Sequence, residues 1–180
     1  QIISILSGIP ISFFQKVLGE KAQIVRLMPN VASSIGEGMT TLSFSPHATV
    51  EFRSFVHLFS APLGKYLEIP ESQMDLATAV AGSGPGFVFA LIQAMADAAE
   101  KGGLSHEQAL LMASQTFAGA AQLALKEKNI TSLLNQITTP GGTTEAGLNL
   151  MRQTQMAEHF QETLRASAQR AKQMAEQSRS

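Results

Sequence analysis

The stretch that decides how this chain is organised is Gln136–Gln153, which reads QITTPGGTTEAGLNLMRQ. A helix cannot continue through Thr138–Gly142, because Pro140 lacks an amide hydrogen and two successive glycines favour turn backbone. A helical pattern resumes at Thr143, so the motif ends one helix and begins another. The first amides of the new helix have no intrahelical acceptor, and the positive end of the helix dipole lies beside them. These features suit a small anion, and glycine lets a ligand approach the backbone closely.

An ordinary helix start explains the same residues without a ligand. A Pro-Gly turn followed by a threonine N-cap, at Thr139 or Thr143, is sufficient, and such caps are far commoner than anion sites. The local pattern therefore leaves both interpretations open.

The composition restricts the class of protein. Of 180 residues, 44% are hydrophobic and only 15% are charged, so we expect a partner subunit to cover part of the surface. The net charge of −1 and the absence of a basic run argue against nucleic-acid binding. The absence of cysteine excludes disulfides and thiolate zinc sites and fits a reducing cytoplasm. The four histidines show no metal-ligand spacing, so no metal site is predicted.

Two apolar segments raise the question of a membrane. Leu76–Ala96 has no charged residue and is long enough to span a bilayer. Residues 82–86, GSGPG, interrupt it, so we predict two helices buried in protein. Gln1–Phe14 is apolar but lacks the basic residues of a signal peptide. We therefore expect a cytoplasmic protein that does not bind a membrane.

The first part of the chain alternates strand and helix patterns. Near-continuous apolar residues predict strands at Gln1–Ser7 and Gln23–Met28, the first of them buried on both faces. A helix between them, ended by Gly19, requires the two strands to be parallel. Two parallel strands are not stable alone, so we expect a larger sheet to precede Gln1.

The α/β pattern continues up to Pro70. Strands are predicted at Met39–Phe44 and Lys65–Ile69, with a helix between them that is capped by Ser45 and has Pro46 at its first position. This helix carries an apolar stripe at i, i+3, i+4 and i+7, formed by Phe52, Phe55, Val56 and Phe59. His57, beside the stripe, is expected at the edge of the core.

Every periodic segment after Pro70 is helical. The predicted helices are Glu71–Ala81, Pro85–Lys101, one from the capping box at Ser105 to Lys128, a short one capped by Thr131, the one beginning at Thr143, and Gln155–Ser178. Residues 82–87 are predicted to separate the first two. Pro85–Lys101 and the helix after Ser105 are apolar or small around most of their circumference, and a domain of this length cannot cover both. We therefore predict an interlocked dimer.

Three motifs resemble the pyrroline-5-carboxylate reductase family. The segment TPGGTTEAGL at residues 139–148 is similar to the family's Ser-Pro-Gly-Gly-Thr-Thr followed by Ala-Gly-Leu. The segment AGSGPGF at residues 81–87 resembles its Ser-Gly-Ser-Gly-Pro-Ala motif, and residues 28–30 resemble its Met-Pro-Asn-Thr-Pro at the end of a strand. The chain departs from these motifs at Val31, Ala32, Ala81 and Gly86.

The resemblance implies an enzyme that reduces 1-pyrroline-5-carboxylate to L-proline with NADPH or NADH, the last step of proline biosynthesis. The implied cofactor contacts are Met28, Pro29 and Asn30. Thr144 is the implied catalytic residue, near the ring nitrogen of the substrate, where it can orient the imine. The implied substrate-binding residues are Thr139, Gly141, Gly142, Thr143, Thr144 and Ser83. Glu127 matches a family glutamate near the active site, although a solvated glutamate at a helix end explains it as well.

The fold implied by the resemblance has two parts. Residues 1–70 would be the α/β remnant of a Rossmann-type NAD(P)-binding domain, and residues 71–180 an all-helical dimerisation and substrate-binding domain. The resemblance implies a dimer through this helical domain, because family members are such dimers and often assemble further into rings of dimers. The glycine-rich phosphate-binding turn is absent from these residues, so most cofactor contacts are expected upstream of Gln1. The chain alone is therefore expected to be inactive.

Two alternatives stay open. The helical part could be the oligomerisation domain of another two-domain NAD(P)-dependent dehydrogenase, in which a different substrate motif is expected at residues 138–144. It could also be a helical oligomerisation module without enzymatic activity. In that case, changes at Thr143 and Thr144 would affect nothing but assembly.

Overall fold

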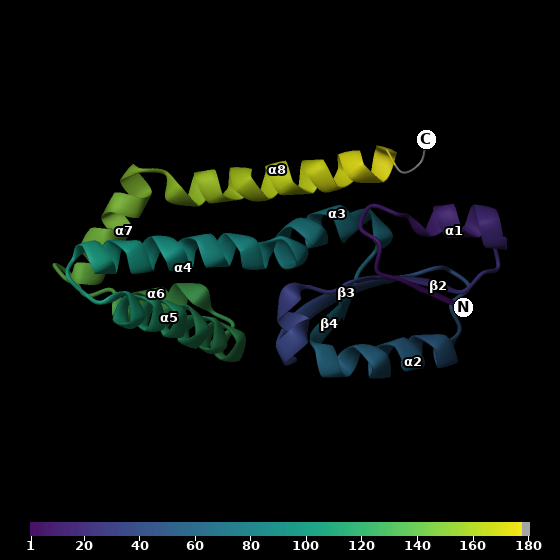
Figure 1. Cartoon of the computed structure of the whole chain (residues 1–180), viewed down its shortest axis with the longest axis horizontal. Helices are drawn as coiled ribbons and strands as arrows, with labels where there is room; N and C mark the ends of the chain where they lie inside the picture. Colours follow the sequence, from purple (N-terminus) through teal and green to yellow (C-terminus); the bar gives the residue numbers. More distant parts are fainter. Residues whose placement is uncertain (178–180) are drawn as a thin grey trace. The chain divides into compact units, whose positions relative to one another are not determined.

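The computed structural model describes residues 1–177, which form two compact units (Figure 1). Unit 1 comprises residues 1–85 together with the last helix from residue 161 onward, and unit 2 comprises Gly86–Phe160. Two long helices, α4 (Gly84–Lys101) and α8 (Met156–Gln177), take part in both units. The predicted division at residue 70 follows the change in sequence pattern and remains a prediction. The predicted helix end near Ser178 lies outside the described residues.

Unit 1 is built on a mixed sheet of four strands in the order β1-β2-β3-β4. As predicted, β1 (Ile2–Ser4) and β2 (Ile24–Met28) are parallel and are joined through α1 (Ile11–Leu18). The next strand, β3 (Gly38–Phe44), is antiparallel to β2, and β4 (Gly64–Glu68) is parallel to β3. The chain therefore reverses direction once in the sheet, between β2 and β3.

The first strand is shorter and more exposed than predicted. It ends at Ser4, and the side chains of Ile5 and Leu6 are 64% and 57% exposed. Within the described residues, β1 is an edge strand, so only one of its sides has a strand neighbour. The prediction that Gln1–Ser7 is buried on both faces is wrong for this structure.

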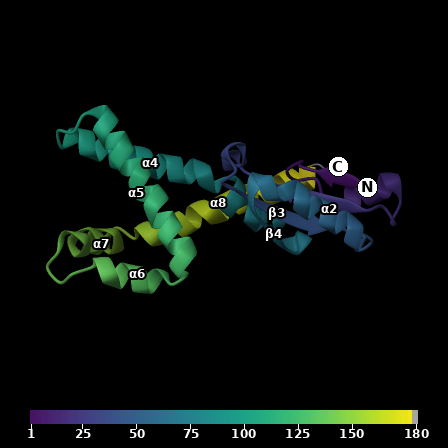
Figure 2. The same cartoon turned by 90° about the horizontal axis from the view of Figure 1, so that it is seen from below.

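One face of the sheet is covered by α2 (Val50–Ser60), which lies in front of β3 and β4 in Figure 2. The N-cap of α2 is Thr49, whose hydroxyl accepts a hydrogen bond from the amide of Phe52. The predicted cap at Ser45 is wrong, because the hydroxyl of that buried residue accepts from the amide of Ile24 at 3.0 Å instead.

Only half of the apolar stripe on α2 belongs to the core. Phe52 and Val56 are fully buried against the sheet, where they meet Val25, Leu27 and Leu42. Phe55 and Phe59 stack on each other and remain more than half exposed, because the helix touches the sheet along the i, i+4 line only. His57 lies at the edge of the core as predicted, with its ring stacked on Tyr66 and edge-on to Phe44.

A helical segment that begins at Glu71 packs on the sheet, where it contacts β3 and, through Glu71 and Gly82, the side chains of Arg26 and Met28 in β2. It contains a 3₁₀ turn at Glu71–Gln73, α3 (Met74–Ala77) and a π turn at Thr78–Gly82, and it leads directly into α4. The predicted break at residues 82–87 is wrong, because the chain stays helical through the glycines. Pro85 is tolerated there because it lies in the first turn of α4.

This helical run is apolar and largely exposed. By length and composition, Glu71–Lys101 could cross a membrane, since its most apolar window has a mean hydropathy of 1.5. Only 11% of that window is buried within the chain. The prediction that these helices are buried in protein therefore requires a second subunit.

Unit 2 is helical, with the later part of α4 followed by α5 (His106–Glu127), α6 (Ile130–Ile137) and α7 (Thr143–Gln153). The start of α5 has the predicted capping box, formed by Ser105 and Gln108. The cap of α6 is Asn129 and not the predicted Thr131, because the Asn129 side chain accepts from the Ser132 amide. The contact between α4 and α5 consists mainly of alanines, namely Ala96, Ala109 and Ala113, against which Ile92 and Ala99 pack.

Candidate functional site

The turn before α7 has the backbone expected of a ligand-binding helix start. The amide of Gly142 donates to the carbonyl of Thr139 at 2.9 Å, and Gly141 has a φ of 72°, a left-handed conformation that favours glycine. Gly142 itself is the N-cap of α7. It has no side chain that could accept from the first amides of the helix. The alternative of a threonine N-cap at Thr139 or Thr143 is therefore wrong.

Gly142 is also required by the turn itself. A Cβ atom at this position would lie 2.9 Å from the carbonyl oxygen of Thr139 and closer still to its hydroxyl oxygen. A real Cβ is almost never found so near to backbone atoms. The sequence explains this glycine by turn backbone and by ligand approach, and the structure adds a steric reason, the contact with Thr139 inside the turn.

Glu145 is a further member of this turn that the sequence analysis missed. Its carboxylate accepts from the amide of Gly141 at 2.8 Å, so its negative charge lies at the start of α7. An acidic residue three positions after a helix N-cap commonly reaches back in this way, so the sequence contained the signal. The amide of Gly141 is thus occupied, and the free donors of the turn are those of the first residues of α7.

The predicted cofactor residues lie in unit 1, together with Ser83. The side-chain amide of Asn30, just after β2, donates to the carbonyl of Ala81 at 2.9 Å. Gly82 lies against Met28, since a Cβ at Gly82 would come within 2.9 Å of the Met28 Cε atom. The Ser83 amide donates to the carbonyl of Thr78 at 2.8 Å and closes the π turn. The structure therefore brings the Met28–Asn30 segment and Ser83 close together, although they are far apart in the sequence.

The predicted site residues thus form two groups, one in each unit. Thr139, Gly141, Gly142, Thr143 and Thr144 share the turn before α7 in unit 2. Met28, Pro29, Asn30 and Ser83 lie around the π turn in unit 1.

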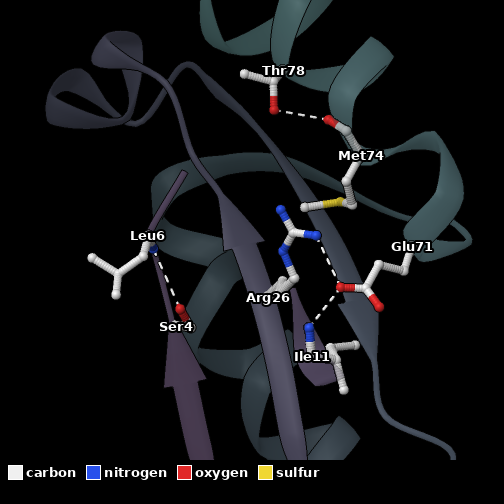
Figure 3. Close-up of polar contacts among 7 residues, drawn as sticks. All are labelled: Ser4, Leu6, Ile11, Arg26, Glu71, Met74 and Thr78. Carbon is white, nitrogen blue, oxygen red and sulfur yellow. Dashed lines mark hydrogen bonds and ion pairs between the residues drawn. The ribbon is translucent and has the colours of Figure 1, made fainter. Parts of the chain in front are cut away.

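An ion pair between buried Arg26 and half-buried Glu71 ties the same helical segment to the sheet (Figure 3). Arg26, only 7% exposed, donates through Nη1 to the Oε1 atom of Glu71 at 2.9 Å. The same carboxylate oxygen accepts from the amide of Ile11 at 2.7 Å. The sequence analysis missed this pair, although an arginine in the middle of the apolar run IVRLM was its signal.

Other ionisable residues offer little for acid–base or metal chemistry. Within residues 1–177, no three His, Asp or Glu side chains are placed so that they could hold a metal ion. His106 contacts Glu100 at 2.7 Å at the exposed corner between α4 and α5. Glu127, at the end of α5, is exposed and borders an apolar groove of about 620 Å³ between α5 and α6.

Comparisons with known proteins agree with one another. The family described as pyrroline-5-carboxylate reductase dimerisation matches residues 71–174. The pyrroline-5-carboxylate reductase of Methanosarcina acetivorans is 35% identical over 96% of this chain, and that of Schizosaccharomyces pombe is 39% identical over 82% of it. The chain spans 64% and 52% of the lengths of these two proteins. The crystal structure of Plasmodium falciparum pyrroline carboxylate reductase with NADP bound has a TM-score of 0.90 and 29% identity, covering 97% of this chain and 69% of that one.

Proposed function

Because the chain belongs to the pyrroline-5-carboxylate reductase family, we propose that the protein carrying it reduces 1-pyrroline-5-carboxylate to L-proline with NADPH or NADH. The observation that carries the proposal is the turn at Thr139–Thr144. It lies inside the matched residues 71–174 and leaves the first amides of α7 without a capping side chain. A carboxylate is the group that such a helix start favours, and the substrate has one.

The substrate carboxylate would bind to the amides of Thr143 and Thr144. The amide of Gly141 is already engaged by Glu145, so it contributes to the shape of the turn and not to binding. The hydroxyl of Thr139 or Thr144 can add a hydrogen bond to the carboxylate. Thr144 is half-buried, and its hydroxyl would orient the imine nitrogen.

The Met28–Asn30 segment would hold the nicotinamide ring at the carboxyl end of β2, the end where open α/β sheets bind ligands. Its residues fit contacts through backbone and apolar atoms, since Met28 is half-buried and Pro29 has no amide hydrogen. When bound, the reduced nicotinamide supplies a hydride to the imine carbon. Thr144 and the turn hold that carbon in position, and a protonated imine needs no strong general acid.

We further propose that the protein is a homodimer through the helical part, with the active site shared between subunits and with rings of dimers as the larger assembly. The match to a dimerisation family supports the dimer, as do the large apolar side chains that α4 and α5 leave exposed. These are Val88, Phe89, Met95, Leu110, Leu111, Met112, Leu123 and Leu125. A soluble chain rarely leaves so much apolar surface uncovered. A cytoplasmic location remains our expectation from the lack of cysteine.

Thr144→Ala tests the substrate site. In the protein as encoded, meaning the whole protein that carries this chain, the substitution should lower kcat/KM for 1-pyrroline-5-carboxylate by about tenfold. This is the effect of losing one hydrogen bond to a charged or polarised group. The measurement is NAD(P)H oxidation at varied substrate concentration, with size-exclusion chromatography in parallel.

Thr154→Ala is the matched control, because the Thr154 hydroxyl donates to the Leu150 carbonyl at the other end of α7. Unchanged kinetics of Thr144→Ala would contradict the role of Thr144. A change in assembly alone would favour the non-enzymatic module. A wild-type protein without reductase activity would contradict the proposed function itself.

A second prediction concerns the 180-residue chain by itself. Its residues contain no glycine-rich phosphate-binding turn, so we expect NADPH to bind more weakly than about micromolar and reductase activity to be absent. Calorimetric titration with NADPH measures this directly, with the protein as encoded as the control. Sub-micromolar affinity of the isolated chain would refute the prediction.

A further inference from the structure

The side chain of Asn30 is engaged at both ends within the fold. Its Nδ2 atom donates to the carbonyl of Ala81 at 2.9 Å, and its Oδ1 atom accepts from the amide of Met39 at 3.4 Å. The residue is partly buried and connects the end of β2 with the start of β3 and with the π turn. Its polar atoms are thus committed to the protein itself.

The contact with Ala81 has a specific cause in the sequence. In an α-helix, the carbonyl of Ala81 would accept from the amide four residues later. That residue is Pro85, which has no amide hydrogen. The Asn30 side chain supplies the hydrogen bond that Pro85 cannot supply.

The π turn needs this support because its own bonding is irregular. The amide of Ser83 donates to the carbonyl of Thr78, five residues earlier, which is the wide π pattern. On the sheet side, Gly82 lies close to the Cε atom at the flexible end of the Met28 side chain. At the start of the segment, Glu71 is anchored to Arg26 (Figure 3). Asn30 therefore holds the end of a segment whose beginning is already anchored.

We propose that Asn30 is a positioning residue, which replaces the amide hydrogen missing at Pro85 and thereby holds the π turn and Ser83 against the end of β2. It acts on the substrate-binding Ser83 and does not contact the cofactor through its side chain. That Ser83 binds substrate rests on the proposed reductase function, whereas the hydrogen bond between Asn30 and Ala81 does not depend on it.

The test is a rescue experiment with three variants of the protein as encoded: Asn30→Ala, Pro85→Ala and the double variant. Asn30→Ala should speed hydrogen exchange of residues 78–84 by about tenfold, the loss of one hydrogen bond. It should raise KM for the imine by about tenfold and change the Kd of NADPH less than about twofold. The double variant should return the exchange rate and KM to within about twofold of wild type, because Pro85→Ala restores an amide hydrogen that can be donated to the Ala81 carbonyl.

Each outcome decides the proposal. A raised Kd of NADPH that Pro85→Ala does not reverse would overturn it, since Asn30 would then contact the cofactor. If Asn30→Ala does not fold, folding of the double variant supports the proposal, and failure of both variants overturns it. Asn135→Ala, on the exposed face of α6, is the matched control and should leave exchange at residues 78–84 unchanged. If the wild type has no reductase activity, the proposed function fails, and hydrogen exchange with its rescue still decides the role of Asn30.

Discussion

Gly142→Val should lower kcat/KM of the protein as encoded by more than about hundredfold, the largest loss that we expect from a single change in the turn. A Cβ at this position would lie 2.9 Å from the carbonyl oxygen of Thr139, so the turn must open to accept it. The branched side chain would also occupy the space beside the first amides of α7. Both effects remove the proposed carboxylate site. Steady-state kinetics with varied 1-pyrroline-5-carboxylate measures the loss.

Gly147→Val is the matched control, because it makes the same change in the middle of α7 where a Cβ meets no atom within 4 Å. Circular dichroism and thermal unfolding of both variants separate a local change in the turn from loss of the fold. A Gly142→Val protein that keeps its kcat/KM within about threefold of wild type would contradict the proposed role of the turn.

Leu111→Asp should dissociate the proposed dimer and raise its dissociation constant by more than about hundredfold. Leu111 is 66% exposed on α5 and lies among the uncovered apolar side chains of α4 and α5. In an assembled dimer, its side chain would be buried, and an unpaired carboxylate at such a position is strongly unfavourable. Light scattering coupled to size-exclusion chromatography at micromolar concentration measures the molecular mass.

Lys16→Glu, an exposed charge change on α1 in unit 1, is the control and should leave the dimer intact. A wild-type protein that is a folded monomer at micromolar concentration would overturn the dimer, and with it the site shared between subunits. A dimeric Leu111→Asp protein would place the interface elsewhere on the molecule.

Much of the local structure could be predicted from the sequence, because its causes are local. The parallel pairing of β1 and β2 follows from the helix between them, and the capping box at Ser105 from hydrogen bonds that span three residues. The turn at Thr138–Gly142 follows from the missing amide hydrogen of Pro140 and the backbone freedom of Gly141, whose φ is 72°. In each case, the residues that make the structure are neighbours in the chain.

The weaker predictions concern residues whose partners lie far away in sequence. The apolar pattern of α2 marked Phe52, Phe55, Val56 and Phe59 alike, yet only the line of Phe52 and Val56 faces the sheet. The sequence placed a cap at Ser45, whereas that hydroxyl is engaged by β2. The periodicity of apolar residues shows which side chains share a helix face, but it does not determine the angle at which the helix crosses the sheet or which of those side chains are buried.

The amino-acid sequence by itself determined the order of strands and helices, the family motifs and the turn that starts α7. Only the tertiary structure decided that the chain stays helical from Thr78 into α4, that Glu71 neutralises Arg26, and that Asn30 bonds to Ala81. The physical reason is that the glycines at 82, 84 and 86 leave the backbone free to follow a turn or a helical path, and that Pro85 lies in the first turn of α4, where a missing amide hydrogen is tolerated. Packing against β2, where the Met28 side chain lies close to Gly82, then favours the conformation that the segment adopts.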